Sequence, residues 1–208
     1  MTGFDLKAAT WDEDPQRREL AAAIAGAMFA VLGLRPGERL LDLGCGTGLV
    51  GHALGQVTGD LLGIDVSAAM VARFRAKTAD RPGLRAEVRD LLAAPLPPGS
   101  VDAAVSAMAF HHLPDPDGML RALHAATVPG GRLAIADLES EDGSFHGAEK
   151  VPWNGFDPAV FTARLTATGW QEPAWRRVHS ITKGGRIYPV FLATARRSGS
   201  LSRWSDTG

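Results

Sequence analysis

The stretch LLDLGCGTGLV, residues 40–50, decides how the rest of the 208-residue sequence is interpreted. It begins as a short apolar run and continues into a loop with glycine at three alternate positions, Gly44, Gly46 and Gly48. The run is typical of a buried strand, and glycines spaced in this way let a ligand lie against bare backbone. The stretch therefore predicts a strand followed by a nucleotide-like binding loop, and the question is which ligand the loop takes.

The composition is that of an ordinary soluble globular protein, with 45% hydrophobic residues, 22% charged residues and a formal net charge of −1. This balance gives no reason to expect nucleic acid or a membrane surface as a partner. The single cysteine, Cys45, excludes an internal disulfide framework and a cysteine-rich zinc site. Neither a signal peptide nor a transmembrane run is evident, so a cytoplasmic protein is predicted. One domain, residues 1–197, is expected, with residues 1–35 as a helical lid and 198–208 as a flexible tail.

Helices and strands alternate along the chain. Asp-Pro pairs at Asp14, Asp115 and Asp157 predict three helix starts, because Asp caps free amides and Pro suits the first helical position. Ser67, as a capping residue, predicts a fourth helix start. Short apolar runs between them predict five buried strands, and two alternating stretches joined at residues 183–185 predict a hairpin. The expected fold is α/β: a Rossmann-like, doubly wound, mostly parallel seven-stranded sheet with a C-terminal antiparallel hairpin.

The loop does not match the phosphate-binding patterns. Its spacing, G-x-G-x-G, is one residue shorter than the dinucleotide fingerprint, and it lacks the Gly-Lys-Ser/Thr of a P-loop. Downstream, Asp65 ends the second predicted strand, where a carboxylate accepts hydrogen bonds from ribose hydroxyls. Asp90 and Leu91 follow the third, where they suit an adenine amino group and ring. An adenosine ligand without phosphate is indicated, and S-adenosylmethionine fits that description.

The ordered motifs resemble those of class I S-adenosylmethionine-dependent methyltransferases. They are LLDLGCGTGLV, the acidic GID, RD after the third strand, VSAMAFHHLPD after the fourth and VPGGRLAIAD into the fifth. The resemblance covers roughly Trp11 to Arg196 and is closest to small bacterial members of the type 11/12 group, which carry TWD…P…R near the start and DGSFHG after the fifth strand.

The resemblance implies that S-adenosylmethionine is the cofactor and assigns residues to it. The glycine loop and Asp42 would hold the methionine part, and the residues after the fourth strand would lie under the sulfonium. An N-terminal arm carrying Trp11 and Arg17 is a candidate lid, with plain packing and a surface role as the alternatives. The expected cofactor-binding residues are Trp11, Arg17, Asp42, Gly44, Cys45, Gly46, Gly48, Asp65, Val66, Met70, Asp90, Leu91, Ser106, Ala107, Met108 and His111.

Candidates for catalysis and acceptor binding follow the fourth and fifth strands. His146 and His111 are the candidate bases, since imidazole transfers protons near neutral pH. The alternatives are a cofactor-side role for the histidines and a capping turn for the loop. The expected substrate-binding residues are His112, Asp137, Glu139, His146, Trp153 and Phe156, the two aromatics alternatively stapling the next helix. The catechol-type magnesium site needs an acid after the fourth strand and an Asp-Asn pair after the fifth. Only Asp137 is available here, so no metal is expected.

The sequence thus predicts a methyltransferase acting on a small-molecule acceptor by in-line transfer, helped mainly by proximity and orientation. A catalytically silent cofactor-binding module that regulates a partner is the alternative. A dehydrogenase is disfavoured by the glycine spacing. The identity of the acceptor, the atom methylated and the oligomeric state stay open.

Overall fold

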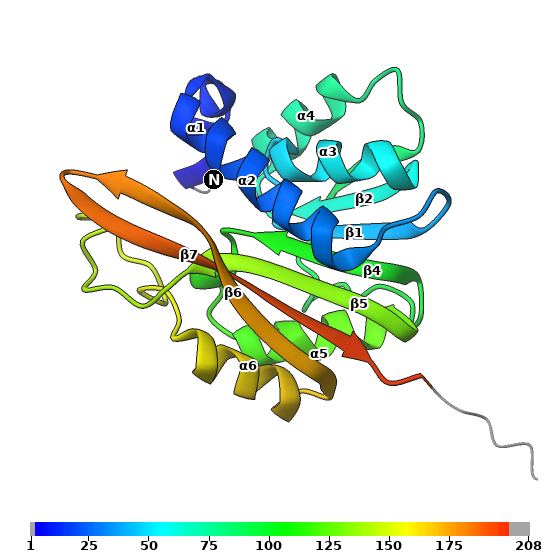
Figure 1. Cartoon of the computed structure of the whole chain (residues 1–208). Coiled ribbons are helices and arrows are strands. Elements are labelled where there is room, and N and C mark those ends of the chain that lie inside the picture. The colour runs from blue at the N-terminus through cyan, green and yellow to red at the C-terminus, as the bar shows by residue number, and fades with distance from the viewer. Residues whose placement is uncertain (1–2, 200–208) are drawn as a thin grey trace, which may run out of the picture.

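Seven strands form one mixed sheet in the computed structural model, which describes residues 3–199 (Figure 1). The spatial order is β3-β2-β1-β4-β5-β7-β6. The first five strands are parallel: β1 (Arg39–Leu43), β2 (Asp60–Asp65), β3 (Leu84–Val88), β4 (Val101–Ala107) and β5 (Thr127–Leu138). β7 (Arg186–Arg197) runs antiparallel between β5 and β6 (Trp170–Lys183). The predicted fold class is confirmed.

The predicted caps form at the helix starts. Asp14 Oδ1 accepts from the amide of Gln16 at 2.9 Å at the start of α2 (Pro15–Leu32). Asp115 and Asp157 do the same for α5 (Pro116–Ala126) and α6 (Pro158–Ala167), and Ser67 caps α4 (Ala68–Lys77). Two further helices are α1 (Gly3–Lys7) and α3 (Leu49–Thr58), and short 3-10 turns span Trp11–Glu13 and Phe110–His112.

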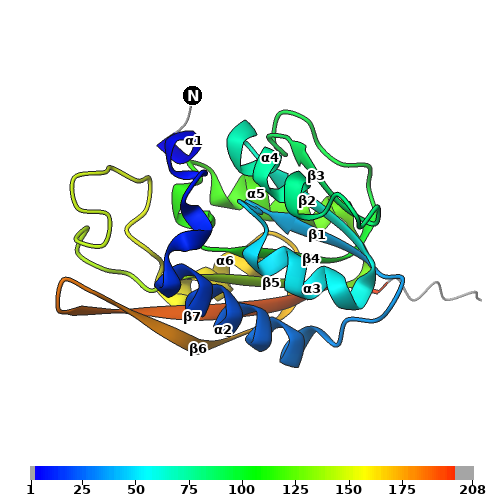
Figure 2. The same cartoon turned by 90° about the horizontal axis from the view of Figure 1, so that it is seen from above.

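Helices cover both faces of the sheet (Figures 1 and 2). α2, α3 and α4 contribute to one buried cluster, which includes Met28, Leu54 and Phe74. α5 and α6 contribute to the other, which includes Leu120 and Phe161. Because both faces are covered, a ligand can reach the sheet at the ends of its strands and not at its faces. Among residues 3–199, we find no helix of the length and apolar character that a membrane crossing requires.

Some boundaries differ from the prediction. α3 is not among the predicted helices, because Gly48 at its start offers no side-chain cap. β5 begins at Thr127, so the Pro-Gly-Gly expected to separate helix from strand lies inside the strand. β6, the first strand of the predicted hairpin, is a mostly exposed edge strand. It therefore lacks the apolar run that marks the inner strands. The predicted tail, residues 198–208, falls outside the described residues from position 200 onward.

Candidate active site

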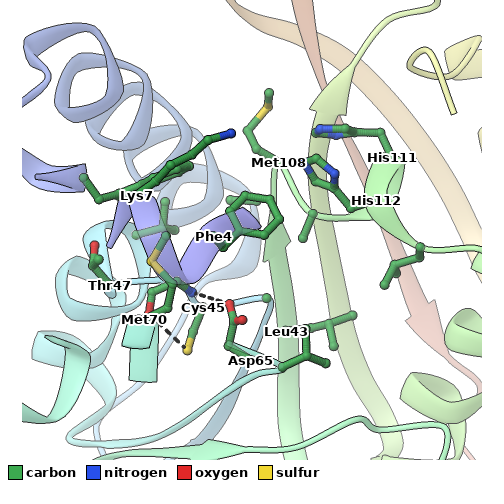
Figure 3. A pocket seen from close by; sticks show the side chains of 18 of the residues that line it. Phe4, Lys7, Leu43, Cys45, Thr47, Asp65, Met70, Met108, His111 and His112 are labelled. Carbon is green, nitrogen blue, oxygen red and sulfur yellow. Dashed lines mark hydrogen bonds between the residues drawn. The ribbon is translucent and has the colours of Figure 1, made fainter. Parts of the chain in front are cut away.

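A cavity of about 900 Å³ opens at the carboxyl ends of the parallel strands (Figure 3). Strand order reverses between β1 and β4, and in open α/β sheets ligands bind at this switch point. Its walls come from the glycine loop, the ends of β2 and β4, the N-terminal segment and the loop after β5. A drug-sized ligand needs about 300–1,000 Å³, so the cavity has room for a nucleoside-sized ligand and a small acceptor.

The glycine loop presents bare backbone to this cavity. Gly44, Gly46 and Gly48 have φ of 67°, 52° and 88°, values that favour glycine. A Cβ on Gly46 would meet no atom within 4 Å, and this residue lines the cavity. A Cβ on Gly44 would lie 2.5 Å from that of Ala109, so this glycine also permits close packing. Gly48 is not among the lining residues; it starts α3 and packs on Phe74.

Two acidic side chains stand beside the loop. Asp65 accepts from the amides of Gly46 (2.9 Å) and Ser67 (2.8 Å), which fixes its carboxylate at the cavity wall. Asp42 is buried, and its Oδ2 has no hydrogen-bond partner. Burial, reinforced by the charge of Asp65, raises the pKa of Asp42 to about 8. A buried carboxyl with one unpaired oxygen suits a ligand that carries positive charge, as the methionine end of S-adenosylmethionine does.

Most of the other expected cofactor residues line the same cavity. Asp90 Oδ1 accepts from the amide of Leu92 at 2.9 Å, and its neighbour Leu91 is buried. Val66 is 58% exposed although it is apolar, and it lines the cavity. Met108 has a φ of 56°, a strained value for a side chain of this size at the end of β4. The expected residues with cavity contact are Trp11, Arg17, Asp42, Gly44, Cys45, Gly46, Asp65, Val66, Met70, Asp90, Leu91, Ala107, Met108, His111, His112 and His146.

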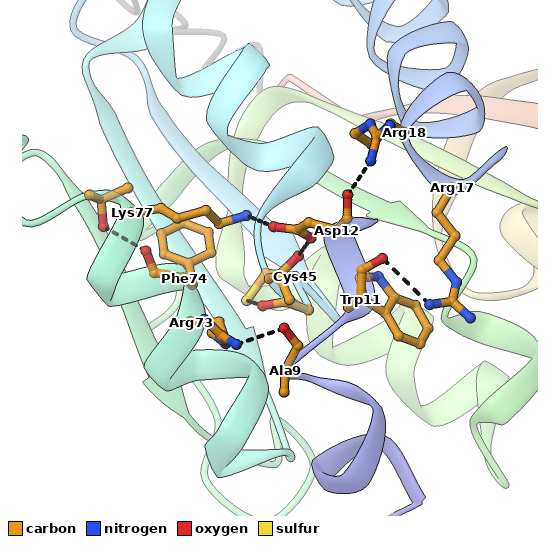
Figure 4. A network of polar contacts seen from close by, with 12 residues as sticks. Ala9, Trp11, Asp12, Arg17, Arg18, Cys45, Arg73, Phe74 and Lys77 are labelled. Atoms are coloured by element: carbon orange, nitrogen blue, oxygen red, sulfur yellow. Dashed lines mark hydrogen bonds and ion pairs between the residues drawn. The ribbon is translucent and has the colours of Figure 1, made fainter. Parts of the chain in front are cut away.

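The N-terminal arm is tied to the glycine loop and to α4 (Figure 4). Arg17 stacks on the ring of Trp11 at 4.0 Å, and both line the cavity. Asp12 accepts from the hydroxyl of Thr47 at 2.5 Å and pairs with Lys77 at 2.6 Å. These contacts place the predicted arm against the loop.

A roof over the cavity is formed by α1, a helix inside the expected lid segment (residues 1–35) that the sequence did not itself predict. Phe4 packs edge-on against His112, with ring centroids 4.9 Å apart, and Lys7 pairs with Glu149 at 2.8 Å. On the other side, the Ser67 hydroxyl donates to Asp5 at 2.6 Å. The helix therefore connects α4 with the loop after β5, and Phe4, Lys7 and Glu149 line the cavity. A five-residue helix has no periodicity that would have identified it.

Three histidines gather at the end of the cavity away from Asp65 (Figure 3 shows two of them). His111 Nδ1–H donates to Asp137 at 2.6 Å, and both side chains are buried. Burial, followed by the neighbouring imidazoles, lowers the pKa of His112 to about 3. Burial also lowers the pKa of His146, whose Nε2 has no hydrogen-bond partner. His112 and His146 therefore carry neutral imidazoles at neutral pH.

Besides Gly48, five expected residues do not line the cavity. The hydroxyl of Ser106 donates to the carbonyl of Leu43, and Asp137 lies beneath His111. Glu139 pairs with Arg177 on β6, because its side chain points to the edge hairpin. Trp153 and Phe156 are not a cavity wall. Trp153 Nε1 donates to the Leu113 carbonyl and its ring stacks near Phe156, which packs on Phe161 of α6; this is the staple arrangement left open by the sequence.

Residues 41–135 match the family described as "Methyltransferase domain". The chain is 31% identical to a trans-aconitate 2-methyltransferase of Deinococcus radiodurans, over 94% of this chain and 79% of the relative. It is also 31% identical to a 27-O-demethylrifamycin SV methyltransferase of Amycolatopsis mediterranei, over 66% of this chain and 53% of the relative. For most of the curated relatives that it matches, the chain spans about half of their length.

Solved structures share the fold. A chain of the complex between the Haloferax volcanii Trm112 methyltransferase activator and a methyltransferase superposes with a TM-score of 0.81 at 21% identity, covering 95% of this chain and 99% of that one. A SAM-dependent methyltransferase from Aquifex aeolicus gives a TM-score of 0.70 at 24% identity, covering 92% and 97%.

Proposed function

Since this chain belongs to the class I S-adenosylmethionine-dependent methyltransferases, we propose that it transfers a methyl group from that cofactor to a small-molecule acceptor. The observation that carries the proposal is a large cavity in which a glycine loop and carboxylates at one end face three histidines at the other. A cavity that held only the cofactor would not need the region lined by the three histidines. The catalytically silent alternative is not favoured.

The chain's own residues would account for cofactor binding. Gly44 and Gly46 would let the methionine part approach the backbone, with Asp42 supplying negative charge once it releases its proton on binding. Asp65 would accept from the ribose hydroxyls, since its two oxygens keep lone pairs beyond the two amides that they already accept from. Asp90 and the exposed side chain of Val66 would meet the adenine. When bound, S-adenosylmethionine supplies an electrophilic methyl group on a sulfonium.

At the other end, the residues would orient the acceptor and handle its proton. Displacement at the methyl carbon is in-line, so alignment of the two reactants and exclusion of water contribute much of the rate. The α1 roof and Phe4 would exclude water. The free Nε2 of His146 could accept a proton from a hydroxyl, thiol or carbon acid, and an acceptor that is already ionised needs no base. His111, held by Asp137, is the second candidate.

A small acceptor is supported by the relatives, which are named for trans-aconitate, 27-O-demethylrifamycin SV and 2-methyl-6-phytyl-1,4-hydroquinone. Arg17 and Lys7 near the cavity mouth are already paired with Asp14 and Glu149, so they do not by themselves select an anion.

The test combines binding with turnover. Calorimetry should show one site for S-adenosylhomocysteine, and incubation with labelled S-adenosylmethionine and a metabolite extract should yield a labelled product, identified by mass. Binding without any labelled product across extracts would favour the silent module. Thermal stabilisation by NAD and not by S-adenosylhomocysteine would refute the cofactor assignment.

A further inference from the structure

The three histidines come together from two separate segments. His111 and His112 lie in the 3-10 turn after β4, and His146 lies in the loop after β5. Their ring centroids are 4.0 Å (His111–His112), 4.9 Å (His111–His146) and 5.3 Å (His112–His146) apart. One ring nitrogen from each lies within 4.8 Å of the others. A metal bound by imidazoles at about 2.0–2.1 Å in tetrahedral geometry holds ring centres about 5 Å apart, so the present spacing is close to that of a formed site.

Asp137 orients one of these imidazoles for metal binding. Its Oδ1 accepts the Nδ1–H of His111, and its two oxygens also accept from the amides of Leu138 and His111. All three donors hold the carboxylate in place. With Nδ1 donating, the lone pair of His111 lies on Nε2. Metal-binding histidines commonly donate their other ring N–H to a carboxylate in this way.

His146 supplies the second, independent observation. Its Nε2 is buried and has no hydrogen-bond partner, which costs free energy unless a ligand satisfies it. The loop around it is well anchored, since the Ser144 hydroxyl contacts the Tyr188 hydroxyl at 2.8 Å and the Phe145 amide donates to Glu141 at 3.0 Å. The ring therefore stays beside the other two because its backbone is held there.

We propose that His111, His112 and His146 bind one divalent transition-metal ion, of the Zn²⁺ or Co²⁺ kind, with a coordination position left open toward the cavity. Three imidazoles suit these metals and do not suit Mg²⁺ or Ca²⁺, which prefer oxygen ligands. Three protein ligands with an open position are typical of catalytic zinc sites. Ring nitrogens 4.8 Å apart must approach by about 1.4 Å, because a tetrahedral site places them about 3.4 Å apart. This proposal replaces the expectation of no metal, which considered only a cysteine-rich zinc site and a carboxylate magnesium site.

The open position has a use that rests on the proposed function. An acceptor that binds the metal through oxygen or sulfur becomes more acidic and gives its proton to solvent water. Its lone pair then forms the bond to the methyl carbon as the carbon–sulfur bond breaks, and the cofactor leaves as neutral S-adenosylhomocysteine. In this arrangement the metal activates the acceptor, and no single imidazole acts as the base.

The test measures metal binding without activity. Tag-free protein, stripped with a chelator, is titrated with Co²⁺ and followed by visible absorption, with Zn²⁺ competition by calorimetry. We expect one equivalent bound, with intense tetrahedral Co²⁺ bands that shift when azide is added to the open position. His146→Ala and His112→Ala should each weaken binding by at least 10–100-fold, about the loss caused by removing only an outer partner of a metal-binding histidine. His179→Ala, on β6 outside the cavity lining, is the matched control and should bind normally.

Several results would overturn the proposal. They are the absence of a one-to-one site in the wild-type protein, equal binding by His146→Ala and His179→Ala, or a Co²⁺ spectrum unaffected by azide. The first two would return His146 to the role of a free base, and the third would remove the open position. Calorimetry with S-adenosylhomocysteine on the same samples keeps the two proposals separate: intact cofactor binding without metal refutes only the metal site, and the absence of cofactor binding refutes the proposed function.

Discussion

Replacing Asp42 with asparagine should stabilise the ligand-free protein at neutral pH while weakening its binding of S-adenosylmethionine. The side chain is 2% exposed, and Oδ2 has no hydrogen-bond partner. Burial and the nearby charge of Asp65 raise the pKa of Asp42 from 3.8 to about 8. A carboxyl in this environment opposes folding wherever the unfolded chain would ionise it. On the proposed function, the positive charge of the bound cofactor would offset this cost.

The size of the effect follows from linkage. Because the folded state holds the proton more tightly, its stability is greatest below pH 3.8 and falls as pH rises toward 8. Each pH unit in this range removes about 1.4 kcal/mol, so the loss at pH 7 is on the order of 4 kcal/mol. Asparagine cannot ionise and avoids this loss. Its new N–H₂ group needs a partner and costs about 1–3 kcal/mol at every pH, so the pH dependence is the clearer signal.

Urea unfolding of both proteins from pH 5 to pH 8 measures the effect. The wild type should lose about 3 kcal/mol more than the Asp42→Asn variant between pH 5 and pH 7. Asp80→Asn, an exposed carboxyl on the surface, is the control and should follow the wild type. Parallel stability curves for the wild type and Asp42→Asn would refute the reasoning.

Cofactor binding gives an independent arm of the same experiment. If the cation lies against Asp42, the wild type must release a proton on binding, so its affinity should rise about tenfold per pH unit between pH 6 and pH 8. The variant should bind more weakly and without this dependence. An affinity that does not change with pH in the wild type would contradict the assignment of Asp42 to the methionine end.

Three further predictions test the cofactor site and the fold. Asp65→Ala should lose about 1.5–3 kcal/mol of S-adenosylhomocysteine binding, or about 10–100-fold, and unchanged affinity by calorimetry would disprove the ribose role. Trp170→Ala should lower the free energy of unfolding by about 3–5 kcal/mol, because the ring is 1% exposed and its Nε1 donates to the Leu120 carbonyl; a loss below 1 kcal/mol in urea would be inconsistent with this. Asp102→Asn should cost about 1 kcal/mol at pH 7 and little near pH 2, since hydrogen bonds from Arg39 lower the pKa of Asp102 and stabilise the fold only above it; an equal cost at both pH values would show that charge is not the cause.

The sequence predicted the parts of the fold that depend on local chemistry. Asp14, Asp115 and Asp157 cap helices because an Asp-Pro pair satisfies free amides and sets the first helical φ without help from the rest of the chain. α3 was not predicted, because it starts at a glycine that the loop requires and therefore has no capping side chain to identify it. β6 has no apolar run, because it is an exposed edge strand, and it was predicted instead from its alternating pattern as one strand of the hairpin.

The site was predictable where topology fixes it and not where loops do. Asp65 ends β2 and Asp90 follows the parallel neighbour β3, so the sheet places both at the carboxyl ends of its strands. The meeting of His111 with His146 depends on the path of the loop after β5, which no spacing rule gives. Trp153 was misplaced for the same reason: its backbone amide donates to the His111 carbonyl while its ring turns toward α6.

The reversed direction of β7 has a practical consequence for anyone who handles this protein. In the antiparallel register, Arg196 of β7 lies opposite Arg132, which precedes the part of β5 that reaches the cavity. β7 therefore ends on the side of the sheet opposite to the cavity. Gly3, in contrast, lies at the cavity itself. An affinity tag at this end of the chain would start near the cavity and, if made of histidines, would compete for the metal that we propose. A tag attached beyond Arg197 would begin on the far side, and so purification and immobilisation are best designed from that end.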